Sequence, residues 1–198
     1  MTDSAAPGRD AIDAALALLY PGVPAQRRCF ERGDGLEACL AYPAPGHWHY
    51  IGYGLSELYH AGPEEDPDWS GWGFELTLRV RRGAEAVAPD WPFRVVQHIA
   101  THVNTRLVLL EPGHRLDLRR PATGYPALPD APDTGLTAYV LALDPELGEL
   151  PTPNGAVRFL QAVGITAAEV ADGAATVLAR LALADPLLVT DPARAAPG

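Results

Sequence analysis

The chain of 198 residues lacks several features that would place it in a large class of proteins. No apolar run approaches the ~20 residues of a membrane-spanning helix. Residues 1–4 have neither the basic start nor the apolar stretch of a signal peptide. Lysine is absent, and 15 arginines against 25 acidic residues leave a net charge of −10, which would repel nucleic-acid phosphates. We therefore expect a cytoplasmic protein with no nucleic-acid and no membrane partner.

Cysteine is scarce as well. Cys29 and Cys39 flank the turn signal Gly33-Asp34-Gly35, so a hairpin would place them roughly opposite each other, where a disulfide is geometrically possible. In a reducing cytoplasm two buried thiols are the favoured interpretation. Two cysteines alone cannot form a structural zinc site, which takes four protein ligands.

The residues that are present predict one α+β domain. An apolar fraction of 47% is enough for a well-buried core. Strand and helix patterns do not alternate regularly, which favours a mixed, largely antiparallel sheet packed with helices. We expect the domain to span residues 10–191, between flexible ends at residues 1–9 and 192–198.

Helix and strand signals divide the chain further. A first helix is predicted with Asp10 as its cap, a second from Pro89-Asp90-Trp91-Pro92, and a third from Thr166 to Arg180 with Glu169 in the capping-box position. Residues 62–70 are predicted to be an acidic loop, and residues 113–133 an extended surface segment. The predicted strands are residues 26–32, 36–42, 48–53, 74–80, 136–143, 156–162 and 187–189.

The strand at residues 74–80 has the alternation of a half-buried strand. Its apolar and polar residues alternate, so one face of the strand would pack against the core and the other would face water. The alternating residues are Phe74, Glu75, Leu76, Thr77, Leu78, Arg79 and Val80.

Two histidine pairs suggest a metal site. His47 and His49 would share one face of a strand, and His98 and His102 one face of a helix. However, Ile99 stands where a metalloprotease helix carries its glutamate, and no cluster of cysteines or carboxylates completes either pair. We predict no metal and no cofactor, and keep a histidine-based, metal-dependent hydrolase as the lesser alternative.

No catalytic motif emerges from the remaining residues. Gly54-Leu55-Ser56-Glu57-Leu58 lacks the second glycine of a hydrolase elbow, so its Ser-Glu pair indicates a turn or a helix cap. The aromatic residues between 48 and 74 suit a pleated core. Trp69, within the acidic loop, is the one we predict to be exposed as an anchor for a partner. We therefore predict a protein that is not an enzyme.

Several spaced motifs resemble the Suppressor of fused family, in the family's order and over nearly the whole chain. They begin with the two aromatic-glycine runs at residues 47–59 and 71–79. The others are Leu19-Tyr20-Pro21, Asp90-Trp91-Pro92, Leu143-Asp144-Pro145, the run from Thr152-Pro153-Asn154-Gly155 to Val163-Gly164-Ile165, and Leu188-Val189-Thr190-Asp191.

The resemblance implies a single-domain, bacterial-type member that binds another protein. Eukaryotic members clamp an extended peptide between two domains, and His102, Leu110 and His114 align with their peptide-contacting region. Bacterial-type relatives imply an immunity protein that occludes a toxin, for which the acidic chain suggests a basic partner. A regulatory or scaffold protein that binds another cellular partner is the alternative.

Overall fold

The computed structural model describes residues 5–31, 33, 35–60 and 68–194. Within them one sheet runs in the order β1-β2-β3-β4-β8-β6-β5, and β7 pairs with β8 outside this order. The strands are β1 (Gln26–Cys29), β2 (Ala38–Ala44), β3 (His47–Tyr53), β4 (Trp69–Arg81), β5 (Arg115–Asp117), β6 (Leu136–Leu143), β7 (Glu149–Thr152) and β8 (Gly155–Thr166).

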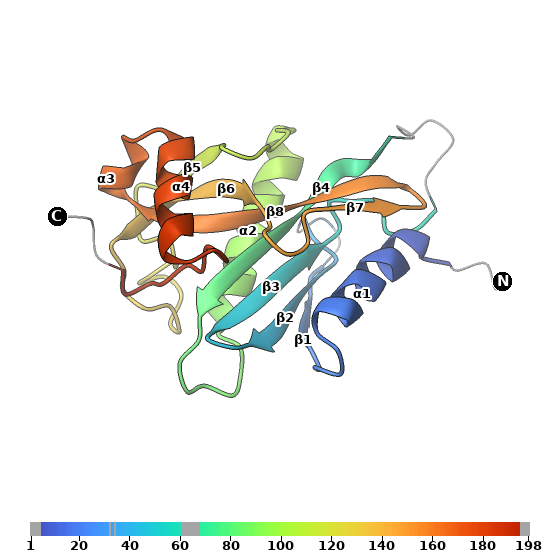
Figure 1. Ribbon diagram of the computed structural model, residues 1–198, viewed down its shortest axis with the longest axis horizontal. Coiled ribbons are helices and arrows are strands. Elements are labelled where there is room, and N and C mark those ends of the chain that lie inside the picture. The colour runs from blue at the N-terminus through green and yellow to red at the C-terminus, as the bar shows by residue number, and fades with distance from the viewer. Residues whose placement is uncertain (1–4, 32, 34, 61–67, 195–198) are drawn as a thin grey trace.

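The sheet is mixed and largely antiparallel, as predicted. The pair β4–β8 is parallel, and it joins the N-terminal meander β1–β4 to the C-terminal strands. The other strand pairs of the sheet are antiparallel. The fold class α+β is therefore confirmed (Figure 1).

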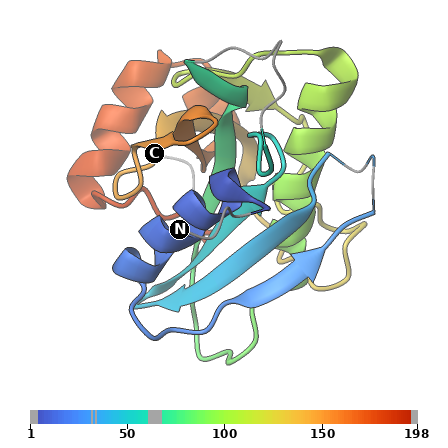
Figure 2. The same cartoon turned by 90° about the vertical axis from the view of Figure 1, so that its right-hand side faces the viewer.

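Helices cover both faces of the sheet (Figures 1 and 2). One face is covered by α2 (Asp90–Arg106), and the other by α1 (Pro7–Leu19) together with α3 (Ala167–Val170) and α4 (Ala174–Ala184). None of the helices in the described ranges is long and apolar enough to cross a membrane.

The alternation of side chains along each strand divides the core into clusters. On β3, Trp48 and Tyr50 pack in the cluster under α2, whereas Ile51 and Tyr53 pack with α1. On β6 and the second half of β8, the apolar residues that face away from α2 pack against α4, whereas Val157 and Phe159 of β8 pack with α1. The α2 cluster is therefore continuous, while two separate apolar clusters occupy the opposite face.

The prediction that β4 is half-buried is wrong. Its apolar residues face α2, but its polar residues Glu75, Thr77 and Arg79 are 0% exposed. The reason is non-local: the turn after β6 bonds to Thr77 and Arg79, and the turn at residues 54–56 bonds to Glu75.

The helix starts differ in part from the predicted ones. Helix α1 begins at Pro7, and Asp10 lies in its first turn and is not its cap, because proline is already suited to start a helix. Helix α2 begins at Asp90, as predicted. The predicted capping box between Thr166 and Glu169 is present, but the helix that follows ends at Val170, and α4 is a separate helix.

The two cysteines are free thiols, and only Cys39 is buried. In the β1–β2 register Cys39 pairs with Arg28, and Cys29 pairs with Ala38. This offset of one residue puts the two side chains on opposite faces, since strand side chains alternate. The possible disulfide is therefore absent, and the prediction of a buried thiol fails at Cys29.

The remaining differences concern short or covered segments. Strands β5 and β7 were not predicted, and β5 lies inside the segment 113–133. The predicted strand at residues 187–189 is no strand, although Thr190 makes a parallel bridge with Val80. Most of the predicted acidic loop lies outside the described residues, and its last residues open β4.

Candidate functional site

Two of the four predicted partner-binding residues line one surface hollow of about 320 Å³, which we call the Trp69 hollow. It lies where the start of β4 meets the segment that follows α2. Its lining residues are Trp69, Gly71, Trp72, Gly73, Phe74, Leu109, Leu110, Glu111 and Arg158.

The Gly71-Trp72-Gly73 motif shapes this hollow. Gly71 and Gly73 have φ angles of +57° and +77°, which residues other than glycine rarely adopt. The register between β4 and β8 shifts between Trp69 and Phe74, as at a β-bulge. A Cβ atom at Gly73 would lie 3.2 Å from the Trp69 ring, so glycine leaves room for the indole.

The two tryptophans of the hollow are held by polar neighbours. The Arg158 guanidinium lies over the Trp69 ring, 4.2 Å from its centroid, and also pairs with Glu149 at 3.0 Å. The Trp72 indole N–H donates to Asn104 of α2 at 2.7 Å. Both rings are therefore oriented before any partner arrives, and each keeps part of its surface exposed.

The opposite wall comes from the end of α2. Leu107 ends this helix in the left-handed region, with φ of +53°, and Leu109 and Leu110 of the segment that follows line the hollow. Leu110 is 4% exposed and packs in the α2 core cluster, whereas Leu109 is 55% exposed. The hollow therefore combines a fixed apolar floor with an exposed apolar side chain.

The other two predicted residues are at the surface but do not line the hollow. His114 is exposed, and its Nδ1 accepts a hydrogen bond from the backbone N–H of Glu111 at 3.2 Å, so it borders the hollow. His102 is exposed on α2. The structure thus brings Trp69 and Leu110 together, with His114 beside them, and leaves His102 apart.

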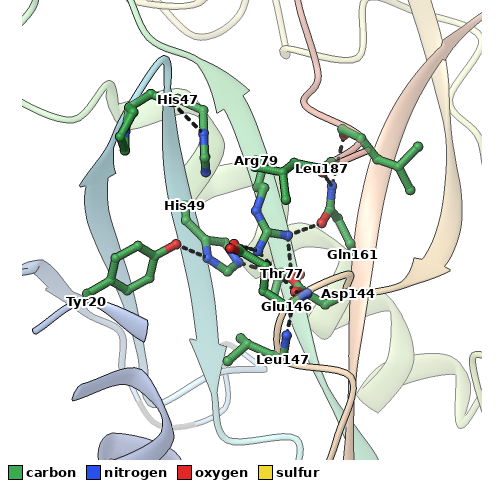
Figure 3. A network of polar contacts seen from close by, with 12 residues as sticks. Tyr20, His47, His49, Thr77, Arg79, Asp144, Glu146, Leu147, Gln161 and Leu187 are labelled. Atoms are coloured by element: carbon green, nitrogen blue, oxygen red, sulfur yellow. Dashed lines mark hydrogen bonds and ion pairs between the residues drawn. The ribbon is translucent and has the colours of Figure 1, made fainter. Parts of the chain in front are cut away.

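A second polar assembly lies on the face of the sheet that points away from α2, and all of its members except the exposed Glu146 are buried (Figure 3). It fills the space between the α1 cluster and the α4 cluster, and we call it the polar seam. Its members are His49 of β3, Thr77 and Arg79 of β4, Gln161 of β8, and Asp144 and Glu146 of the turn after β6.

Asp144 is the centre of the polar seam. Its carboxylate accepts hydrogen bonds from Thr77 at 2.8 Å, from Arg79 at 2.7 and 3.1 Å, and from His49 at 3.1 Å. Its Oδ1 also accepts the backbone N–H groups of Glu146 and Leu147 at 3.0 Å. A buried carboxylate is thereby paired and fully hydrogen-bonded, as burial of a charge requires.

The seam also bonds the C-terminal segment to the sheet. Gln161 accepts from Arg79 and donates to the carbonyls of Leu187 and Leu188, both at 2.9 Å. The segment predicted as a strand is therefore held by a side-chain amide.

The protonation states in the seam follow from burial and charge. Burial lowers the pKa of His49 to about 4, even though its bond with Asp144 raises it. Burial alone would raise the pKa of Asp144, but its hydrogen bonds and the charge of Arg79 outweigh burial and hold it well below its usual range. With His49 neutral, its Nε2–H donates to Asp144 and its Nδ1 accepts from the Tyr20 hydroxyl at 2.7 Å.

The Tyr20-His49-Asp144 order resembles a catalytic relay, but its surroundings favour a structural role. The side chains of His49, Asp144 and Arg79 are 0% exposed, so a substrate has no access to them in this conformation. Sequence reasoning missed the seam because Asp144 and Arg79 are 65 residues apart. The motif Leu143-Asp144-Pro145 was the available signal.

Neither histidine pair is completed by further metal ligands. His47 and His49 share a strand face, as predicted, but both are buried, and the Nδ1 of His47 bonds to the carbonyl of Pro45. His98 and His102 are exposed on α2. Among the described residues no group of three or more His, Cys, Asp and Glu side chains could hold a metal ion.

The predicted turn at residues 54–57 is bonded to a buried carboxylate. Oε1 of Glu75 accepts the backbone N–H groups of Gly54, Leu55 and Ser56, and the Ser56 hydroxyl donates to it at 2.6 Å. Burial raises the pKa of Glu75 to about 7 against these four bonds, which lower it. Ser56 therefore holds the turn to β4.

Comparison with known proteins connects this arrangement to a family. The family model described as Suppressor of fused protein (SUFU) matches residues 33–195. The Suppressor of fused homologs of Homo sapiens and Mus musculus are each 34% identical over 131 residues, which is 63% of this chain and 25% of theirs. The chain thus matches about a quarter of the length of these curated relatives.

Solved structures share the fold. A chain of the Sufu-Fu complex crystal structure is similar with a TM-score of 0.86 at 26% identity, over 98% of this chain and 93% of that one. The crystal structure of Drosophila Suppressor of Fused is similar with a TM-score of 0.85 at 27% identity, over 96% and 51% of the two chains.

Proposed function

This chain belongs to the Suppressor of fused family, and from that premise we propose that it is a regulatory or scaffold protein that binds a partner protein at the Trp69 hollow. The observation that carries the proposal is the hollow itself. It presents an oriented tryptophan and an exposed leucine over an apolar floor, and Trp is enriched among residues that dominate binding energy at interfaces.

The geometry suits a short partner segment. A hollow of about 320 Å³ is large enough for one or two side chains of a partner, and Arg158 and Glu111 at its border can orient a polar backbone. Related Sufu was crystallised in a complex with Fu, which supports protein binding as the general mode. We further propose that residues 10–191 form the functional domain, with His114 at the border of the site and His102 in a more distant contact.

Charge favours a basic partner. The net charge of −10 would speed association with a positively charged protein and would suppress acidic competitors. This observation also supports the narrower alternative, an immunity protein that occludes a basic toxin. The two hypotheses differ in the identity of the partner and share the same surface.

The experiment compares three forms of the full chain as bait in its native host. Leu109→Ser alters the hollow, and Leu18→Ser is the matched control, because Leu18 is 85% exposed on α1. We expect the unaltered chain and the control to retain one common protein that Leu109→Ser loses. The dissociation constant of the complex between the chain and that purified protein should rise at least about tenfold with Leu109→Ser or Trp69→Ala.

Equal retention of every captured protein by all three forms would refute the Trp69 hollow as the binding site. The partner's identity separates the alternatives: a toxin whose activity falls on binding supports immunity, and a host protein without toxicity supports the scaffold. Catalytic turnover by the purified chain would contradict both.

A further inference from the structure

A second hollow lies on the α2 side of the sheet, between α2 and residues 118–128. Its volume is about 480 Å³, within the range of small-molecule sites. We call it the arginine hollow, because Arg94 and Arg120 are at its rim. It shares no lining residue with the Trp69 hollow.

The floor of the arginine hollow is apolar. Ile99 and Tyr139 are 5% and 1% exposed, and the half-buried Leu118 and Leu128 pack against the same core. The Tyr139 hydroxyl already donates to the carbonyl of Ala122 at 3.0 Å. The floor can therefore receive a hydrocarbon group without leaving this hydroxyl unsatisfied.

The rim carries positive charge without acidic partners. Arg94 and Arg120 are both exposed, and neither forms an ion pair with a residue in the described ranges. Within the described part of the chain, the only hydrogen bond of the Arg94 side chain is a long one of 3.3 Å to Gln97. Two such guanidinium groups at one hollow, in a chain of net charge −10, favour an anionic group there.

The wall opposite α2 is held in place by hydrogen bonds. The backbone N–H of Ala122 donates to Leu136 of β6 at 2.8 Å, and the Thr123 hydroxyl donates to the carbonyl of Pro132 at 2.8 Å. The hollow is therefore largely preformed, which lowers the entropic cost of binding a ligand.

We propose that the arginine hollow binds a small amphipathic carboxylate. Its hydrocarbon part would lie on Ile99, Leu118 and Leu128, and its carboxylate would accept hydrogen bonds from Arg94 and Arg120, since the planar guanidinium matches a carboxylate. This site is separate from the proposed partner site and adds a small-molecule ligand to the protein.

The test uses octanoate as the probe, with calorimetry and backbone amide NMR on the full chain. We expect saturable binding, with shifts of the amide signals of Ile99 and Leu118. Hexanoate should bind more weakly by about fourfold per methylene removed. Octanamide, which has the same chain and no charge, should bind at least about tenfold more weakly.

Variants separate the hollow from general surface charge. Arg94→Gln with Arg120→Gln should weaken octanoate binding at least about tenfold, whereas Arg106→Gln, on the same helix and outside the hollow, should not. Ala127→Trp, at an exposed lining position, should fill the hollow and block binding while the fold is kept.

Three results would overturn the proposal. The first is no saturable binding of octanoate to the unaltered chain. The second is equal affinity for octanoate and octanamide. The third is unchanged octanoate binding in the double arginine variant when its amide spectrum still shows the native fold.

Discussion

The polar seam and the Trp69 hollow both lie on the same sheet, but their side chains differ in how far they are exposed to water. In the seam, Arg79 and Asp144 are charged and have no exposed side-chain surface. In the hollow, Arg158, Glu111 and the two tryptophans keep contact with water, and Leu109 is more than half exposed. Enclosure makes the seam a determinant of stability, because removal of one partner leaves a buried charge unpaired. Exposure leaves the hollow available for binding.

The largest expected effect is in the seam. Arg79→Met removes the cation that Asp144, Glu146 and Gln161 share, and leaves the Asp144 carboxylate buried without its main counter-charge. We expect a loss of about 3–5 kcal/mol in the free energy of unfolding, measured with urea at pH 7.

The control lies two residues further along β4. Arg81 also pairs with an aspartate, Asp191, but at 3.5 Å and with 54% of its side chain exposed. Arg81→Met should therefore cost about 1 kcal/mol or less. Similar losses for both variants would mean that enclosure does not separate the seam from the surface.

A second effect depends on pH. His49 is neutral in the fold because burial lowers its pKa to about 4, while the unfolded chain takes up the proton near its ordinary value of 6.5. Stability is therefore lost as the pH falls from 6.5 toward 4. Between pH 7 and 5 this loss is about 2 kcal/mol.

His49→Gln should lack this loss. The difference in unfolding free energy between the unaltered chain and the variant should shrink by about 2 kcal/mol from pH 7 to pH 5. A difference that stays constant over this range would show that His49 is charged in the fold or does not titrate differently on unfolding.

Glu75 should act in the opposite direction. Its pKa is raised to about 7 in the fold from an ordinary value of 4.5. Its contribution to the free energy of unfolding is therefore fully present below pH 4.5 and is lost as the pH rises through 7. From pH 6 to pH 8 the loss is about 1 kcal/mol. Glu75→Gln keeps an acceptor for the backbone N–H groups of residues 54–56 and should remove this pH dependence.

The variant that combines His49→Gln with Glu75→Gln is the internal check. Because protonation of His49 and of Glu75 changes the free energy of unfolding in opposite directions, the two effects partly cancel in the unaltered chain between pH 7 and 5. In each single variant, the free energy of unfolding should change with pH as the remaining group dictates. In the double variant it should show neither dependence. Equal slopes in all four proteins would contradict both pKa shifts.

The local pattern of the sequence predicted the sheet well. Strand β6 has the predicted bounds, β3 begins one residue earlier than predicted, and the parity of β4 places its apolar side chains toward α2. The same parity placed Glu75, Thr77 and Arg79 on the other face, but it could not tell that this face is covered. The cover comes from residues far away in the chain, so no local period contains it.

The candidate site was predictable only through its motifs. Trp69 and Leu110 are 41 positions apart in the numbering, and they meet because the bulge at Gly71-Trp72-Gly73 and the left-handed Leu107 turn both segments toward one place. Its place in the predicted acidic loop indicated that Trp69 is exposed, but the sequence did not show which residues lie beside it, and the ring is half-buried. The unexpected β5 and β7 are three and four residues long, too short for a clear alternation.

The smallest expected effect on stability is in the Trp69 hollow, and it tests the difference between the seam and the hollow most directly. Trp69→Ala removes a half-buried ring and its contact with Arg158, so the free energy of unfolding should fall by about 1 kcal/mol. Leu109→Ser should change it by about 0.5 kcal/mol or less, since Leu109 is mostly exposed. Urea unfolding measures both values under the conditions used for Arg79→Met.

The same two variants should nevertheless lose the partner, because an interface draws its binding energy from a few exposed anchors that cost little in the free protein. The expected result is an inverse relation: Arg79→Met lowers stability strongly while the folded fraction still binds, and the hollow variants lower affinity at nearly full stability. If Arg79→Met and Leu109→Ser changed affinity and stability in the same proportion, the seam and the hollow would act as one unit, and the division between an enclosed and an open region would fail.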